Sequence, residues 1–222
     1  MSTKTRLEPQ PPDLQPPWRT AARVELQLEA RAFAQDIVLP IADELDPKKG
    51  EMPRSLIDQM AAKGWFGITI PAQHGGMGLG VFEYCLVSEE LARAWLSVGS
   101  ILARGQGLGT QTINDDRRLG LLRRSAQGKW IGAIALSEPT AGSDLAAVQT
   151  RATREDGYWL LSGTKRWAGF ALAADFIEVL ARTREPKDGE SRSAGLPPTV
   201  SAPPHCCRSR TPGRRRPRWS RW

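Results

Sequence analysis

The stretch IGAIALSEPTAGSD, residues 131–144, marks the point at which this chain of 222 residues changes character. Its apolar first part, residues 131–136, ends in a turn that contains Pro139 and Gly142. An apolar run followed by turn residues predicts a strand that delivers a polar loop to a surface. Pro139 fixes one backbone angle and Gly142 permits a positive one, so hydroxyl and backbone N–H groups could converge on a flat ligand or a phosphate. From composition alone, a plain strand-to-turn connection is the alternative.

A second stretch, YWLLSGTKRW at residues 158–167, narrows that choice. It contains a hydrophobic strand pattern and a G-x-K-x-W run, and another apolar run follows at residues 175–182. Together with SEPTAGSD at residues 137–144, this order resembles the acyl-CoA dehydrogenase family. In that family a (S/T)EPxAGSD signature precedes a strand, a G-x-K-x-W run and the next strand of a middle β-domain. The resemblance covers roughly residues 18–185.

Apolar residues upstream of residue 128 recur at helical spacing. The pattern predicts helices from Trp18 to Leu45 with an interruption at Pro40, from Pro53 to Gly64, from Val81 to Arg104 and from Thr110 to Gln127. Beyond residue 128 it predicts strands at residues 130–136, 146–154, 158–162 and 175–183, with Asp156-Gly157 as a hairpin turn. The predicted fold class is therefore α+β, an N-terminal all-helical domain followed by an incomplete antiparallel β-domain.

The two ends of the chain differ in composition from its middle. Residues 1–17 contain five prolines and little apolar surface, which predicts a disordered leader. Residues 18–128 are expected to form the helical domain and residues 129–185 a partial middle β-domain. Residues 186–222 hold seven prolines, nine of the 31 basic residues and two of the 24 acidic ones, so the net charge of +7 belongs to this segment. We expect a disordered basic tail without strands, and our hypothesis for its origin is a shifted reading frame.

Composition and motif spacing disfavour several classes of function. Three cysteines, Cys85, Cys206 and Cys207, make neither a disulfide framework nor a metal site, which favours a reducing, cytoplasmic location. No apolar run approaches the ~18 residues of a membrane span. The glycines of residues 75–80 do not have G-x-G-x-x-G spacing, and no G-x-S-x-G elbow accompanies His74 for hydrolysis. The tail carries arginine and tryptophan residues, which can contact phosphates and stack on bases. No nucleic-acid-binding fold precedes the tail, so we expect no specific nucleic-acid partner.

The resemblance also implies a cofactor site. In the family the signature loop holds the isoalloxazine ring of FAD, so the expected cofactor-binding residues are Ile134, Leu136, Ser137, Gly142, Ser143, Trp167, Ala168 and Gly169. Ser137 would supply a hydroxyl, Ser143 would also contact the acyl-CoA substrate, and Trp167 would lie against the ring system, with core packing as the alternative for the tryptophan. The chain departs from the family after Trp167, where Ala168 and Gly169 replace a β-branched and a hydroxyl residue. A backbone N–H would have to stand in for the missing hydroxyl.

The reaction implied by the resemblance is the α,β-dehydrogenation of an acyl-CoA thioester, with hydride transfer to FAD, in fatty acid or amino acid catabolism. An electron-transfer flavoprotein or similar acceptor and a homo-oligomer are expected of an intact enzyme. The family's glutamate base comes from a C-terminal helical domain, so no catalytic residue and no metal ligand is assigned within residues 1–222, and Glu138 is expected to be structural. We expect negligible dehydrogenase activity from these residues alone. The alternatives are a non-catalytic binding or regulatory fragment, and a flavin oxidase or monooxygenase of the same fold.

Overall fold

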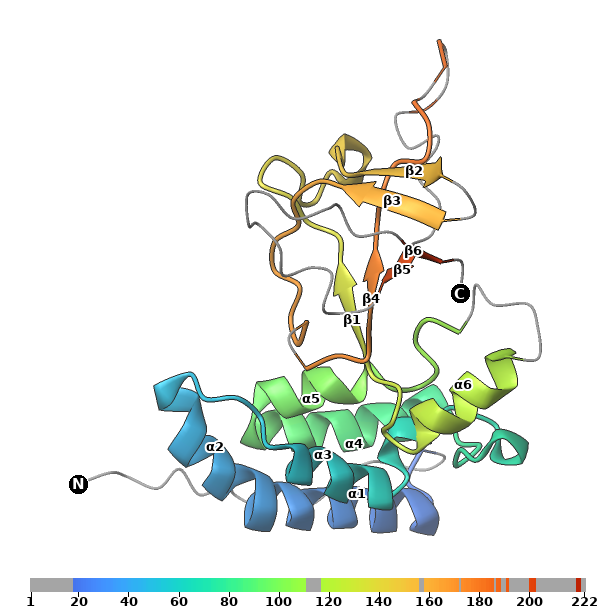
Figure 1. Ribbon diagram of the computed structural model, residues 1–222. Helices are drawn as coiled ribbons and strands as arrows, with labels where there is room; N and C mark the ends of the chain where they lie inside the picture. Colours follow the sequence, from blue (N-terminus) through green and yellow to red (C-terminus); the bar gives the residue numbers. More distant parts are fainter. Residues whose placement is uncertain are drawn as a thin grey trace. The chain divides into compact units, whose positions relative to one another are not determined.

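The computed structural model describes residues 18–110, 117–155, 158–171 and 173–185, with residues 187, 188, 191, 200–202 and 219–220. The chain divides into two compact units, residues 1–107 with 119–129 and residues 108–118 with 130–222. Helices build the first unit and short strands the second (Figure 1). None of the described helices is both long and apolar enough to cross a membrane. The predicted leader, residues 1–17, lies outside the described residues.

The first predicted helix is observed as three consecutive segments: α1 (Ala21–Phe33), a π-helical turn (Ala34–Val38) and α2 (Leu39–Leu45). Thr20 caps α1, because its side chain accepts a hydrogen bond from the backbone N–H of Arg23 at 3.3 Å. Pro40 lies in the first turn of α2, where a missing N–H is tolerated. The interruption predicted at Pro40 therefore takes the form of a change in hydrogen bonding just before it.

The next two predictions had different outcomes. Helix α3 (Arg54–Ala62) stops before Gly64, whose φ of 76° ends it as predicted. The single helix predicted from residue 81 to 104 is wrong, because Trp95 adopts an extended conformation between α4 (Val81–Ala94) and α5 (Leu96–Leu102). The indole N–H of Trp95 donates to Asp46 Oδ1 at 2.9 Å. This contact with a distant residue accompanies a break that the local sequence does not signal.

Helix α6 (Arg117–Ala126) is the described part of the fourth predicted helix, whose first turns at residues 111–116 lie outside the described residues. The helical core is built on aromatic rings: Phe33 and Trp65 meet edge to face at 5.1 Å between ring centres. Trp65 opens a 3-10 turn (Trp65–Gly67), and a second 3-10 turn covers Ala72–His74. At Gly76 an added Cβ would lie 2.1 Å from the carbonyl oxygen of Ile70, so close packing explains this glycine without a nucleotide.

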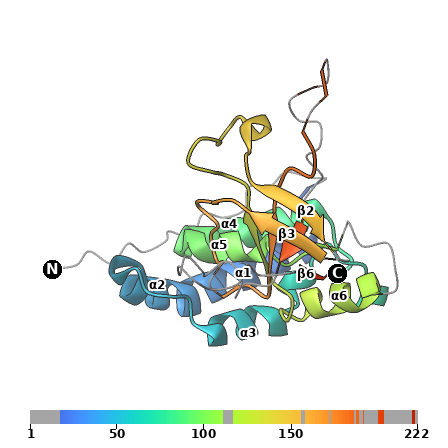
Figure 2. The same cartoon turned by 45° about the horizontal axis from the view of Figure 1, so that its top comes forward.

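The second unit contains two three-stranded sheets. The first has the order β1 (Gly132–Ala135), β4 (Phe176–Val179) and β5 (Val200–Ala202). The second has the order β2 (Arg151–Glu155), β3 (Tyr158–Ser162) and β6 (Trp219–Ser220). Figure 1 labels their strands, and Figure 2 shows β2, β3 and β6 from a second direction. The α+β class is thus confirmed. The β2–β3 hairpin pairs Glu155 with Tyr158 as predicted, and its turn at residues 156–157 lies outside the described residues.

Two features of this unit differ from the sequence predictions. Strands β1 and β4 pair in parallel, whereas an antiparallel domain was expected; the hairpin and the segment after it, which lie between them, form the long connection that parallel pairing needs. Residues 145–147 form a 3-10 turn, so the strand predicted from residue 146 begins only at Arg151.

The prediction of no strands beyond residue 186 is wrong for β5 and β6. Strand β5 pairs with β4, and β6 pairs with β3, both antiparallel. Val200 and Trp219 are residue types that favour strands, and the edges of β4 and β3 offer backbone groups to pair with. The other residues of this segment, apart from 187, 188 and 191, lie outside the described part of the chain.

Candidate functional site

The signature loop follows directly from β1. The backbone N–H of Glu138 donates to the carbonyl of Ala141 at 2.7 Å, and the N–H of Ala141 donates back at 3.3 Å, which closes a tight turn around Pro139. Gly142 and Ser143 lie exposed at its tip. Gly142 does not use the positive φ that the sequence suggested, and an added Cβ would meet no atom within 4 Å. The glycine therefore leaves open space at the loop rather than enabling a special turn.

Glu138 lies inside this loop with its side chain only 4% exposed. Its carboxylate accepts hydrogen bonds from the backbone N–H groups of Gln149 (2.7 Å) and Thr150 (2.9 Å), from the Thr150 hydroxyl, and from Lys165 Nζ (2.8 Å). Burial opposes ionisation of Glu138, but these four donors outweigh it and hold the pKa at about 2. Glu138 is consequently a fully bonded carboxylate, in agreement with the structural role expected of it.

Lys165 connects two stretches that are distant in sequence. Its Nζ donates to the carbonyl of Leu136 at 2.8 Å as well as to Glu138, and its side chain is 11% exposed. Burial lowers the pKa of the Lys165 ammonium, while the neighbouring Glu138 carboxylate acts in the opposite direction. The next residue adds a third link, because the backbone N–H of Arg166 donates to the carbonyl of Ser137 at 2.8 Å. The G-x-K-x-W run is thereby bound to residues 136–138.

Trp167 follows these links in an unusual conformation. Its φ is 62° and the residue is 86% exposed, although tryptophan rarely adopts positive φ. Phe170 repeats the feature with φ of 65°. Ala168 and Phe170 pack against the buried cluster of residues on β1 and β4, and the N–H of Gly169 donates to the carbonyl of Trp167 at 2.9 Å. Each positive φ costs on the order of 1 kcal/mol, so the contacts on both sides of Trp167 hold it in place.

The structure brings together some of the predicted cofactor residues. Leu136 and Ser137 are half-buried and lie beside Lys165 and Arg166 through the hydrogen bonds above. Ile134 is half-buried on β1, and Leu136 is the first residue after the residue that ends this strand. Among the described residues, no hydrogen bond or ring contact joins Gly142 or Ser143 to the tryptophan segment. The loop tip and the tryptophan are both exposed, so both remain accessible to a ligand.

Sequence reasoning missed the residues that hold this arrangement together. Thr150 was assigned only to a strand, and Lys165 was noted in the motif without a role. A buried carboxylate is paired or hydrogen-bonded, but the sequence does not show that Glu138, rather than Asp144 of the same loop, is the buried one. Nor does it show which of the chain's lysines and arginines is the partner.

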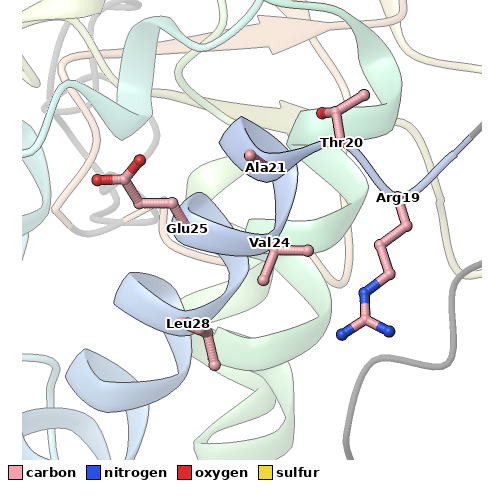
Figure 3. Close-up of a pocket in the computed structure, with 6 residues that line it drawn as sticks. All are labelled: Arg19, Thr20, Ala21, Val24, Glu25 and Leu28. Atoms are coloured by element: carbon pink, nitrogen blue, oxygen red, sulfur yellow. The ribbon is translucent and has the colours of Figure 1, made fainter.

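A surface hollow of about 500 Å³ lies in the helical unit, along the first turns of α1 (Figure 3). It is lined by a single stretch of chain: Arg19, Thr20, Ala21, Val24, Glu25 and Leu28. None of the predicted cofactor residues lines it. Among the described residues, no group of three histidine, cysteine or acidic side chains could hold a metal ion.

Comparison with known proteins places this geometry in a family. Residues 20–116 match the model of the acyl-CoA dehydrogenase N-terminal domain, and residues 133–200 match the model of the middle domain. This chain belongs to the acyl-CoA dehydrogenase family. The second match spans the signature loop, the Lys165 segment and strands β1 to β4. The helical and strand units therefore correspond to the family's first two domains.

One relative and two solved structures illustrate the extent of the match. The benzylmalonyl-CoA dehydrogenase of Aromatoleum aromaticum is 37% identical over 159 residues, which is 70% of this chain and 42% of the relative. A solved structure of a probable acyl-CoA dehydrogenase from Mycobacterium abscessus has a TM-score of 0.73 and 30% identity, covering 85% of this chain and 50% of the other. A structure named for the electron transferring flavoprotein of Acidaminococcus fermentans has a TM-score of 0.68 and 32% identity over 75% of this chain and 44% of the other. The chain thus spans half or less of each.

Proposed function

We propose that this chain forms the first two domains of a flavin-dependent acyl-CoA dehydrogenase that binds FAD. The observation that carries the proposal is the three-bond connection between residues 136–138 and residues 165–166, which presents an exposed Trp167 beside the signature loop. A flat aromatic ring with a polar edge needs an apolar surface and hydrogen-bond donors next to each other. The loop and the tryptophan segment supply both within one unit of the protein.

The residues present fit an isoalloxazine ring. Trp167 offers an exposed apolar face, and the open space at Gly142 lets a ligand approach the loop backbone. The hydroxyls of Ser137 and Ser143 and the backbone groups of Ile134, Leu136, Ala168 and Gly169 would hold the ring edge. The Glu138 carboxylate is already paired with Lys165, so this residue presents no unpaired negative charge to the ligand. Bound FAD would accept a hydride equivalent from the acyl chain.

The side chains of the loop would act by binding and orientation. Ser143 would contact the acyl-CoA and Ser137 would donate to the flavin, while the buried cluster under Ala168 and Phe170 would exclude water from one side. Gly169 carries no hydroxyl, so its position offers only backbone groups. Phe170 supplies apolar contact where the family often has a polar residue.

Glu138 would not remove the α-proton. A carboxylate whose pKa is about 2 is a weak base, and its two oxygens already accept four hydrogen bonds. We propose that the base comes from the family's C-terminal helical domain and that residues 1–222 alone turn over acyl-CoA negligibly. An acyl-CoA substrate in fatty acid or amino acid catabolism, an electron-transfer flavoprotein as acceptor, a homo-oligomer and a cytoplasmic location belong to the same proposal, and the likeness to the Acidaminococcus fermentans structure supports the acceptor.

Titration of the purified chain with FAD tests the proposal. We expect quenching of flavin fluorescence with a measurable Kd, and weakening on the order of tenfold for Trp167→Ala because the stacking surface is lost. Leu28→Ser is the matched control, because Leu28 lies on the surface of α1 and far from Trp167 in the sequence. This variant should bind FAD normally. Absence of FAD binding to the folded chain, or equal binding by Trp167→Ala, would overturn the proposal.

A further inference from the structure

The ion pair between Glu138 and Lys165 sits at the junction of the two stretches that the proposed site requires. Lys165 donates to Glu138 and to Leu136, and the neighbouring Arg166 donates to Ser137. Three consecutive residues of the loop, 136–138, therefore each accept a bond from residues 165–166. Neither charged side chain needs to touch a ligand for this connection to set where the loop and the tryptophan lie.

The conformation just after the pair depends on this connection. Trp167 has positive φ, and within the described part of the chain its ring makes no aromatic or cation–π contact. Among the described residues, packing of the largely exposed ring does not hold it. A strained residue keeps its conformation only when its surroundings determine it. Here the determining contacts are the hydrogen bonds of residues 165–166 on one side and the packing of Ala168 and Phe170 on the other.

We infer that the Glu138–Lys165 ion pair is a positioning device, which holds the backbone of residues 165–170 against the Ser137 loop and so fixes the direction of the Trp167 ring. Its effect on FAD rests on the proposed function; its effect on the segment does not. Loss of either charge loosens the segment while every group that would touch the cofactor stays in the chain. Both residues are positioning residues, not catalytic ones.

The test compares four variants of the 222-residue chain: Lys165→Met, Lys165→Arg, Glu138→Gln and Arg151→Met. The last is the matched control, because it removes an ion pair of the same unit, Arg151 with Glu185, in which both side chains are more than half exposed. Amide hydrogen exchange is read at Arg166 and Gly169, whose N–H groups are bonded in the folded chain, and at the β2–β3 hairpin as an internal reference. FAD affinity is measured in parallel.

We expect exchange at Arg166 to accelerate on the order of tenfold in Lys165→Met and Glu138→Gln, with the hairpin unchanged, near-normal behaviour in Lys165→Arg, and no effect in Arg151→Met. FAD should bind on the order of tenfold more weakly to the first two variants. Unchanged exchange in both would overturn the inference. Acceleration that extends to the hairpin would also overturn it, because the pair would then serve general stability. A chain that binds no FAD while exchange responds as expected would refute the proposed function and leave the positioning role standing.

Discussion

Two buried ion pairs, one in each unit, use the same chemistry for different ends. In the helical unit Arg31 on α1 meets Glu90 on α4 at 2.7 Å, and in the β unit Lys165 meets Glu138 at 2.8 Å. The partners of the first lie on regular helices, whereas the partners of the second lie on loops. An ion pair between two helices joins elements whose backbone conformation is already set by helical hydrogen bonds. An ion pair between two loops helps to set the backbone conformation of the loops themselves.

The two carboxylates also differ in their other hydrogen-bond donors. Besides Arg31, Glu90 has one further side-chain donor, Gln27 Nε2 at 3.0 Å, and Gln27 Oε1 has no partner among the described residues. Glu138 has two backbone N–H groups and a hydroxyl in addition to its lysine. Glu138 thus has more hydrogen-bond donors than Glu90. Several bonds fix the position of the loop in the proposed site, whereas the contact between the helices has fewer such bonds.

The largest expected effect comes from Arg31→Met. It leaves the Glu90 carboxylate buried with one remaining side-chain donor, so the helical unit should lose about 3–5 kcal/mol of stability. The pKa of Arg31 is raised, chiefly by its hydrogen bond to Glu90, which agrees with a tightly held pair. Urea titration followed by hydrogen exchange in α1 and α4 measures the loss. Equal loosening of residues 165–170 in this variant would contradict the separation of the two pairs.

Acid is expected to loosen the contact between the signature loop and residues 165–170 next. The folded-state pKa of Glu138, about 2, lies below its ordinary value of 4.5, so the folded state binds fewer protons and the ionised carboxylate favours folding. This contribution, about 3 kcal/mol, is complete above pH 4.5 and is lost as the pH falls toward 2. Hydrogen exchange at Arg166 between pH 7 and 2.5, taken relative to the intrinsic rate at each pH and to the β2–β3 hairpin, measures it. Glu138→Gln is the control and should lack this part of the pH dependence.

Lys165→Met should cost the segment of residues 165–170 less than Arg31→Met costs the helices. Three donors remain on Glu138, so about 1–3 kcal/mol is expected. Native-state hydrogen exchange at Arg166, with β2 and β3 as the unchanged reference, gives the value for this segment. A loss as large as that of Arg31→Met would show that the extra donors do not compensate, and would remove the contrast between the two sites.

The smallest expected effect is a gain. Trp167→Gly relieves the positive φ and removes an exposed ring, so the ligand-free β unit should become about 0.5–1 kcal/mol more stable. FAD affinity should fall in the same variant. Trp167→Phe keeps the strain and should leave stability unchanged. A destabilised Trp167→Gly chain would mean that the ring packs against the protein, and would weaken its assignment to a ligand.

The sequence was sufficient for some elements and insufficient for others. Strand β3 has the predicted bounds, and α3 stops at Gly64 as predicted, because both depend on local alternation or on a single glycine. The break at Trp95 coincides with a hydrogen bond from its indole to Asp46, 49 residues away, and no local pattern reveals either feature. For the same reason the family motif pointed to Ser137 and Trp167, but the bonds from Lys165 and Arg166 that bring their segments together required the structure.

The parallel pairing of β1 with β4 has a consequence for how the chain acquires its fold. The β2–β3 hairpin joins near neighbours and can close as soon as it leaves the ribosome, whereas Gly132 must wait for Phe176. Closing a loop of that length is slow relative to forming a hairpin. During synthesis, the strand that carries the signature loop therefore has no β4 beside it until the Lys165 segment has already emerged. The Glu138–Lys165 ion pair can form before β1 pairs with β4. It would then position β4 next to β1 during folding, and it holds the loop in the folded protein.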